Sequence, residues 1–164
     1  MRDRLWNELT QVKHNVEFIT LYSDLQRKYI KWFNISILIF SAGGIMGWKI
    51  WDSFPLVACI IISFISLVRL IQPHLIMSEK QITILDQIHT FYFNYYNQLE
   101  RLWYEYEDNR INNNTATNKF FELKEKEIEI NIKVSDTIRI KPKKLIKKAK
   151  HYSDQYFASV YNIN

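Results

Sequence analysis

The side chains that could carry catalytic or metal chemistry are few and scattered along this chain. The single cysteine, Cys59, excludes an intramolecular disulfide and a cysteine-rich metal site. The few glycines do not form a phosphate-binding loop. The histidines fall in separate regions, without an HExxH or similar pairing, at His14, His74, His89 and His151. The sequence therefore predicts no catalytic, cofactor or metal site, and no enzymatic activity.

Two long apolar segments dominate the sequence. They run from Trp32 to Trp48 and from Phe54 to Ile71, separated by five residues. As a helix rising about 1.5 Å per residue, the first would be roughly 25 Å long, which nearly matches the hydrocarbon core of a bilayer. Pro55 stands in the first turn of the second segment, where a helix tolerates proline. The sequence predicts an all-α membrane protein with a two-span transmembrane helical hairpin, occupying residues 29–77.

A soluble protein with two buried core helices is the alternative, and 24% charged residues allow it. Against this alternative, the apolar residues form two continuous blocks, whereas the flanking regions are amphipathic. The residues expected to anchor the spans at the membrane interfaces are Trp32, Trp48, Trp51 and Arg69. For Arg69, an anchor whose side chain reaches the headgroups and a pore-lining residue both stay open.

The distribution of basic residues predicts the orientation of the hairpin. Six lysines and arginines precede Trp32, fourteen follow the second segment, and the turn between the segments holds only Lys49. Both termini are therefore expected on the cytoplasmic side. The formal net charge of +5 suits anionic lipid better than nucleic acid as a partner.

Small and polar residues inside the segments could pack the spans together or line a pore. Gly43 and Gly47 have the small-xxx-small spacing that permits close helix contact, either with Ala58 and Ser63 of the same chain or between subunits. Asp52, repeated around a ring of subunits, would favour cations at a pore mouth. The full set expected for span packing or a pore is Gly43, Gly44, Gly47, Ser63 and Ser66.

Amphipathic helices are predicted on both sides of the hairpin. Residues 1–28 form a cytoplasmic helix, and residues 78–108 form a long one that Ser78 could cap. The long helix carries a heptad seam, which packs against the N-terminal helix or against another subunit, and a charge at Leu99 is expected to disturb assembly. The seam consists of Leu85, Ile88, Tyr92, Tyr95, Leu99, Leu102 and Tyr106.

The C-terminal part is predicted to begin with a polar loop over residues 109–118, followed by a helical module over 119–164. Between residues 126 and 140, alternating isoleucines fit a strand, but spaced Glu and Lys pairs favour a helix. A basic stretch then opens the last helix and could contact lipid, a nucleotide phosphate, a partner or only water. Its lysines include Lys143, Lys144, Lys147, Lys148 and Lys150.

This order of elements resembles the SLATT superfamily of bacterial membrane effectors. The resemblance covers residues 5–106, from LWNELTQVKHNVEFITLYSDLQRKYIKWF to the tyrosine-rich helix after the second segment. It implies an effector of an antiviral or conflict system in the bacterial inner membrane. Such an effector oligomerises to form a pore or disrupt the membrane when signalled by a sensor or nucleotide-signalling protein, which could be encoded in the same operon. The alternative is a non-conducting membrane anchor or regulatory subunit that recruits a cytoplasmic partner.

Overall fold

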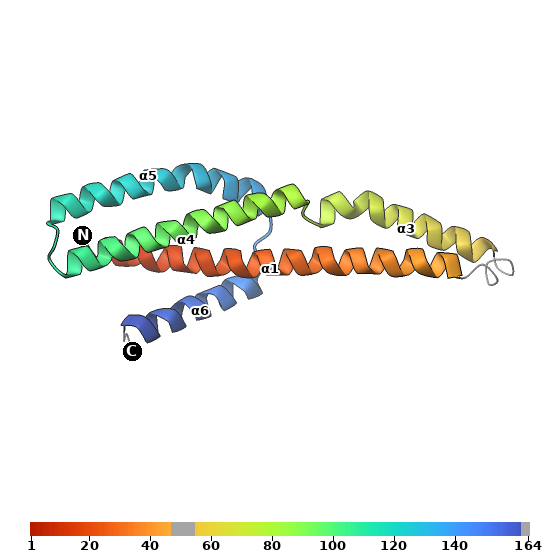
Figure 1. Cartoon of the computed structure of the whole chain (residues 1–164), viewed down its shortest axis with the longest axis horizontal. Coiled ribbons are helices and arrows are strands. Elements are labelled where there is room, and N and C mark those ends of the chain that lie inside the picture. Colours follow the sequence, from red (N-terminus) through yellow and green to blue (C-terminus); the bar gives the residue numbers. More distant parts are fainter. Residues whose placement is uncertain (47–54, 162–164) are drawn as a thin grey trace. The chain divides into compact units, whose positions relative to one another are not determined.

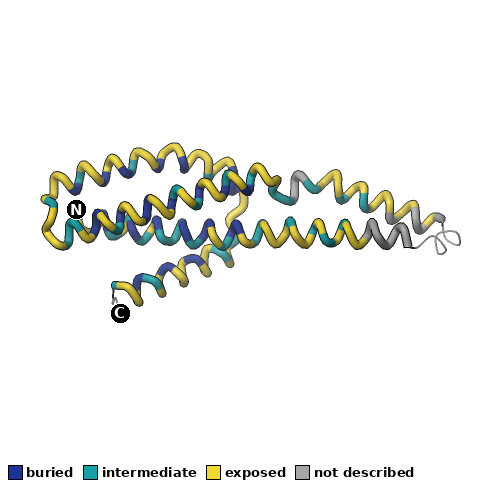
Figure 2. The backbone as a smooth tube through the Cα atoms, in the orientation of Figure 1, coloured by how far each residue is buried: buried dark blue, intermediate teal, exposed yellow. Residues whose placement is uncertain are grey.

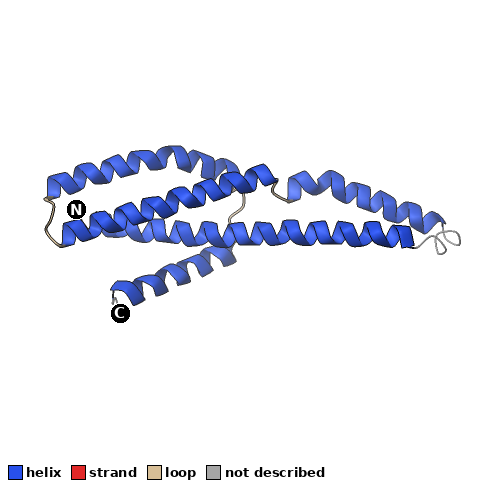
Figure 3. Cartoon of the chain, in the orientation of Figure 1, coloured by secondary structure: helices blue, strands red, loops and turns tan. Residues whose placement is uncertain are grey.

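The structure is a computed structural model that describes residues 1–46 and 55–161. Within these ranges every regular element is a helix (Figure 3). In chain order the helices, labelled in Figure 1, are α1 (Arg2–Met46), α3 (Pro55–Leu75), α4 (Glu79–Glu107), α5 (Asn113–Thr137) and α6 (Lys143–Tyr161). The helix expected over residues 78–108 corresponds to α4, and the predicted N-terminal helix continues without a break to Met46.

The chain divides into two compact units. The bundle unit comprises residues 1–23 and 83–164, and it contains the first half of α1, most of α4, and the whole of α5 and α6. The hairpin unit comprises residues 24–82 and contains the second half of α1 and the whole of α3.

The expectation of a two-span transmembrane hairpin is wrong. Among the described residues, no helix combines the length and the apolar character needed to cross a membrane. Within the described residues, the apolar part of α1 runs from Trp32 to Met46, which is shorter than the roughly 20 residues that a span requires. Helix α3 carries the polar residues Arg69 and Gln72 in its last two turns. The two apolar segments are thus helical, but neither provides a spanning helix in the described part of the chain.

The core of the bundle unit forms because several helices repeat apolar residues at alternating steps of three and four. This spacing keeps the apolar side chains on one face, as in coiled coils. The buried residues with this spacing on α1 include Leu5, Leu9, Val12, Val16 and Ile19, and on α5 they include Ala116, Phe120, Leu123 and Ile130, with the charged Glu127 at the intervening position. Figure 2 shows these buried positions along the inner sides of the helices.

The order of contacts along the helices sets their directions within the bundle unit. Arg2 pairs with Glu107, whereas Lys13 lies over the ring of Tyr96, so α1 and α4 are antiparallel. Polar contacts place α5 against α1 and α4, and ring contacts place α6 against the same two helices. In Figure 1, α5 and α6 lie on opposite sides of the α1–α4 pair.

Side-chain caps determine where two helices begin. At α4, the Ser78 hydroxyl accepts a bond from the Gln81 backbone N–H at 3.3 Å, and the Gln81 side chain accepts one from the Ser78 N–H at 2.8 Å. This reciprocal pair is a capping box. At α5, the Asn112 side chain accepts a bond from the Thr115 N–H at 2.9 Å. The predicted loop over 109–118 is therefore too long, because this cap starts the helix at Asn113.

Residues 126–137, for which the sequence allowed either a helix or a strand, belong to helix α5. It continues to Thr137, and Lys133 and Glu129 form an ion pair of 3.0 Å one turn apart. The alternating isoleucines lie on different faces of this helix: Ile130 is buried, whereas Ile128 and Ile132 are exposed. The expectation of a helix is confirmed for residues 126–137.

Candidate functional site

An apolar surface is the main feature of the hairpin unit. Figure 2 shows mostly exposed positions along α3 and the second half of α1. We call this set the apolar surface, and its members, which are 56–73% exposed, are Trp32, Leu38, Ile39, Leu56, Ile60, Ile62, Phe64, Leu67 and Leu70. So many large apolar side chains exposed within one unit are unusual for a monomeric soluble protein, which rarely exposes contiguous apolar patches larger than a few hundred Å². Such a surface indicates contact with another apolar partner.

Two serines of the hairpin unit, Ser36 and Ser66, form hydrogen bonds within their own helices. The Ser66 hydroxyl donates to the Ile62 carbonyl at 2.8 Å, and the Ser36 hydroxyl donates to the Trp32 carbonyl at 2.9 Å. Both hydroxyls are therefore bonded within their own helix, as serines in apolar helices commonly are. A cavity of about 70 Å³ between α1 and α3 has an apolar lining that includes Phe33 and Phe64.

The other residues expected in spans or at a pore lie at three kinds of position. Ser63 and Arg69 are exposed on α3. Gly43 and Gly44 lie near the end of α1. The residues Gly47, Trp48, Trp51 and Asp52 lie outside the described residues.

The predicted oligomer seam on α4 is buried within the chain itself. Leu85, Ile88 and Leu99 are fully buried, Tyr92, Tyr95 and Leu102 are at most 3% exposed, and only Tyr106 is half-buried. This burial corresponds to the intrachain alternative, in which the seam packs in the bundle unit.

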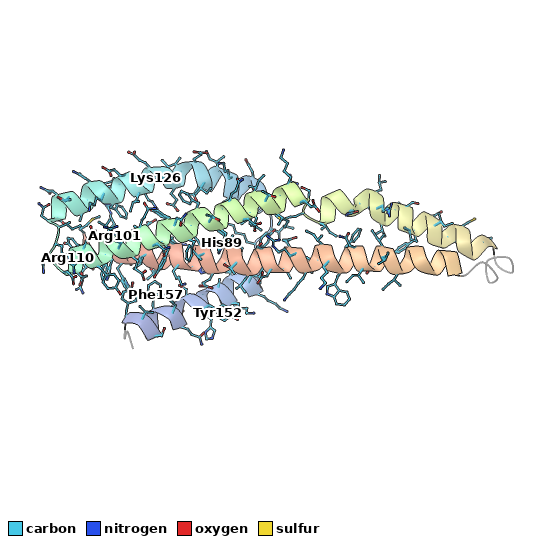
Figure 4. The ribbon with its side chains drawn as sticks, in the orientation of Figure 1. His89, Arg101, Arg110, Lys126, Tyr152 and Phe157 are labelled. Atoms are coloured by element: carbon cyan, nitrogen blue, oxygen red, sulfur yellow. The ribbon has the colours of Figure 1, made fainter. Side chains whose placement is uncertain are left out.

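The lysines of the basic stretch lie on the surface. Lys143, Lys144, Lys147, Lys148 and Lys150 are all exposed on α6, and none forms an ion pair with another described residue. Lys148 lies 5.4 Å from the centre of the Tyr152 ring, which Figure 4 labels on the outer side of α6. The first half of α6 thus presents a cationic face to solvent, suited to an anionic partner.

Within the bundle unit, a cluster of tyrosines around one carboxylate joins α6 to α4. A single oxygen of Glu100, Oε1, accepts hydroxyl bonds from Tyr96 at 2.7 Å, Tyr161 at 2.9 Å and Tyr156 at 3.2 Å. The Lys13 ammonium lies 4.0 Å from the Tyr156 ring centre. Burial is the main cause that raises the pKa of Tyr96 and Tyr161 well above the ordinary value, and hydrogen bonds with Tyr156 for Tyr96 and with Glu100 for both tyrosines add to this effect.

A second polar network lies between α1, α4 and α5. The Lys124 ammonium contacts Glu8 at 2.6 Å and Glu127 at 2.7 Å, and the Tyr95 hydroxyl donates to Glu8 at 3.3 Å. Burial by itself lowers the pKa of Lys124, but bonds to the two carboxylates, together with their charges, raise it overall. Burial is the main cause of the raised pKa of Tyr95. The Lys124 ammonium therefore forms ion pairs with two carboxylates, and one of them, Glu127, is almost fully buried.

The histidines lie apart in the described structure. His14 is half-buried, and burial lowers its pKa, whereas His89 stacks on Phe93 at 6.3 Å. Figure 4 labels His89 on α4, and His151 is exposed on α6. Within residues 1–46 and 55–161, no group of three His, Cys, Asp or Glu side chains could hold a metal ion.

Sequence reasoning missed both polar clusters. Each has a local part that spacing could have revealed, since Tyr96 and Glu100 are one helical turn apart, as are Lys124 and Glu127. The remaining partners, such as Tyr161 and Glu8, come from helices distant in sequence. No periodic signal could have identified them.

Comparisons with known proteins add nothing to this geometry. A scan against models of known protein families, a search of curated proteins and a search of solved structures all found no match to the chain. The class supported by the structure is an all-helical protein with a packed bundle unit and an apolar hairpin unit. The resemblance to SLATT effectors stays a prediction.

Proposed function

We propose that this protein is a membrane-active effector whose hairpin unit self-associates and acts on lipid, while its bundle unit receives the controlling partner. The observation that carries the proposal is the concentration of exposed large apolar side chains on residues 24–82. Contact with lipid chains or with other copies would remove this surface from water and gain roughly 25 cal/mol per Å². The proposal assigns no spanning path to α1 or α3.

The bundle unit supports the proposed division of roles. Its seam is already buried, so the bundle unit does not need another subunit to complete its core. A folded unit with polar clusters between its helices can receive a signal, whereas the apolar surface provides the contact with lipid. By the resemblance in layout, we place this action at a bacterial inner membrane.

Two isoleucines allow a matched test, since Ile62 in the hairpin unit and Ile128 in the bundle unit are each 64% exposed. We expect the wild-type chain to release dye from vesicles of phosphatidylethanolamine and phosphatidylglycerol and to sediment as an oligomer. Ile62→Lys should reduce leakage about tenfold and shift the protein toward monomer, because a desolvated lysine costs several kcal/mol. Ile128→Lys should change neither result.

Comparing the two variants in leakage, and measuring vesicle binding by the wild-type chain, distinguishes a specific role of the hairpin unit from a general effect of charge. Equal loss in both variants would point to a general effect of charge, and a wild-type chain that neither binds nor permeabilises vesicles would refute the proposal. Membrane potential in cells that express the same variants provides the corresponding cellular measurement.

A second candidate function is a non-conducting regulatory subunit that recruits a partner. The exposed cationic face of α6 favours it, because five lysines there lack ion pairs with described residues. In this case, Lys143→Glu with Lys147→Glu would abolish binding to anionic vesicles or to the partner, and the wild-type chain would bind without leakage. Under the first proposal, the same changes would leave leakage from neutral vesicles intact.

A further inference from the structure

A groove at one end of the bundle unit combines aromatic walls with an acidic rim. Its volume is about 500 Å³, within the range of ligand sites. Trp6, Trp103 and Tyr161 line it from α1, α4 and α6. Trp6 lies 5.0 Å from Trp103 and 5.2 Å from Tyr161, ring centre to ring centre. The ring of Phe157, labelled in Figure 4, packs against Trp6 and supports this wall.

Arg2 shows which chemistry this groove accepts. Its guanidinium carbon lies 5.8 Å from the Trp103 ring centre, and its nitrogens donate to the two carboxylate oxygens of Glu107 at 2.8 and 3.1 Å. An aromatic face below the cation and a two-point carboxylate contact at its edge are the two features that recognise a guanidinium. The Arg2 side chain is nevertheless 66% exposed, so this contact lies at the surface.

The charge of the groove also favours a cation. Three acidic side chains, Asp3, Glu107 and Asp108, and one basic side chain, Arg2, line it, so its formal charge is −2. The chain as a whole carries +5. Asp108 pairs with Arg110 at 2.9 Å, whereas Asp3 forms no ion pair within the described residues. An unpaired carboxylate beside an aromatic wall can receive a further cation.

We propose that this groove binds an arginine side chain presented by a segment of a partner polypeptide, with Arg2 as the internal competitor for Glu107 and Trp103. The open groove is larger than one guanidinium needs, so residues flanking the arginine can also lie in it. This binding does not depend on the proposed action on lipid, and either can fail without the other.

The test uses the fluorescence of the full chain, because Trp6 and Trp103 line the groove. A capped glycine–serine peptide with one central arginine should change this fluorescence in a saturable way. The same peptide with citrulline, which keeps the shape but lacks the charge, should bind about tenfold more weakly. Equal affinity for both peptides, or no saturable change with either, would overturn the proposal.

Two variants should change the affinity for the arginine peptide in opposite directions. Arg2→Ala removes the competitor and should tighten binding several-fold, whereas Glu107→Gln removes the charged acceptor and should weaken it about tenfold. Arg4→Ala is the matched control, since Arg4 lies over Phe121, which is not among the groove residues, and it should leave the affinity unchanged. Circular dichroism checks that each variant is folded. Weaker or unchanged binding by folded Arg2→Ala would contradict the role of Arg2 as competitor.

Discussion

At the scale of single residues, Glu100 connects two helices through one of its carboxylate oxygens. It lies on α4 and accepts one bond from its own helix and two from α6, all at the same oxygen. Hydrogen bonds to a charged acceptor contribute more to stability than bonds between neutral groups. The attachment of α6 to the bundle unit therefore depends strongly on one carboxylate.

Glu100→Ala should lower the free energy of unfolding by about 2–3 kcal/mol, because three tyrosine hydroxyls lose a charged acceptor and water replaces it only in part. Urea unfolding followed by circular dichroism measures this loss. Glu125→Ala, at an exposed position of α5, is the control and should stay within about 0.5 kcal/mol of wild type. Similar values for the two variants would show that the tyrosine cluster contributes little.

Alkaline pH should destabilise the bundle unit through the same tyrosines. Burial raises the pKa of Tyr92, Tyr95, Tyr96 and Tyr161 above the ordinary value of 10.0. The unfolded chain therefore loses these protons at lower pH than the folded chain, so the tyrosines leave stability unchanged below about pH 10 and lower it as pH rises toward the folded values.

Urea unfolding at about pH 9 and about pH 11 tests this dependence on tyrosine ionisation. A smaller loss of stability between the two pH values is expected for Tyr96→Phe, which cannot ionise. If wild type and Tyr96→Phe lost the same stability, other groups would be responsible for the pH dependence.

At the scale of elements, the helix boundaries depend on side-chain caps that lie close in sequence. Asn112 caps the start of α5, and Ser78 caps the start of α4. Both residues are of types that favour the N-cap position, so such boundaries can be recognised from sequence. The composition of residues 109–118 is typical of loops and predicts one, but Asn112 within this stretch caps a helix.

Asn112→Ala should destabilise the bundle unit by about 1 kcal/mol, because the Thr115 N–H loses its acceptor. Thermal or urea unfolding measures the change. Asn114→Ala replaces an exposed asparagine inside the same helix and should have a much smaller effect. A loss of equal size in the two variants would mean that the cap does not determine where α5 begins.

At the scale of the whole molecule, apolar residues serve two different purposes in the two units. In the bundle unit they are buried between helices of the same chain, and in the hairpin unit many remain exposed. Leu99, the residue expected to control assembly, belongs to the first group and is fully buried. A substitution there acts on the fold of the bundle unit before it can act on assembly.

Leu99→Ala should therefore reduce the free energy of unfolding by about 2–5 kcal/mol, as expected for a cavity in a packed core. Leu70→Ala, at a position 73% exposed in the hairpin unit, is the control and should have little effect on unfolding of the bundle unit. If Leu99→Ala changed oligomer size but left unfolding unchanged, the seam would be an interface between subunits.

The sequence by itself determined the helical class and the buried faces of the bundle unit. Helical periodicity is local, so the sequence alone predicts the seam from Leu85 to Leu102 and the apolar face of the N-terminal helix, and both are buried. Apolar composition is local too, but it does not show that a segment forms a helix long and apolar enough to cross a membrane. For this reason, it led to the wrong expectation of two membrane spans.

Only the tertiary structure decided which polar residues meet. Glu100 with Tyr161, Glu8 with Lys124, and Arg2 with Glu107 are brought together from helices far apart in the chain. These contacts depend on the order and direction in which the helices pack, and no pattern along one helix encodes them. The aromatic groove exists for the same reason, because three helices each contribute a ring at one end of the bundle unit.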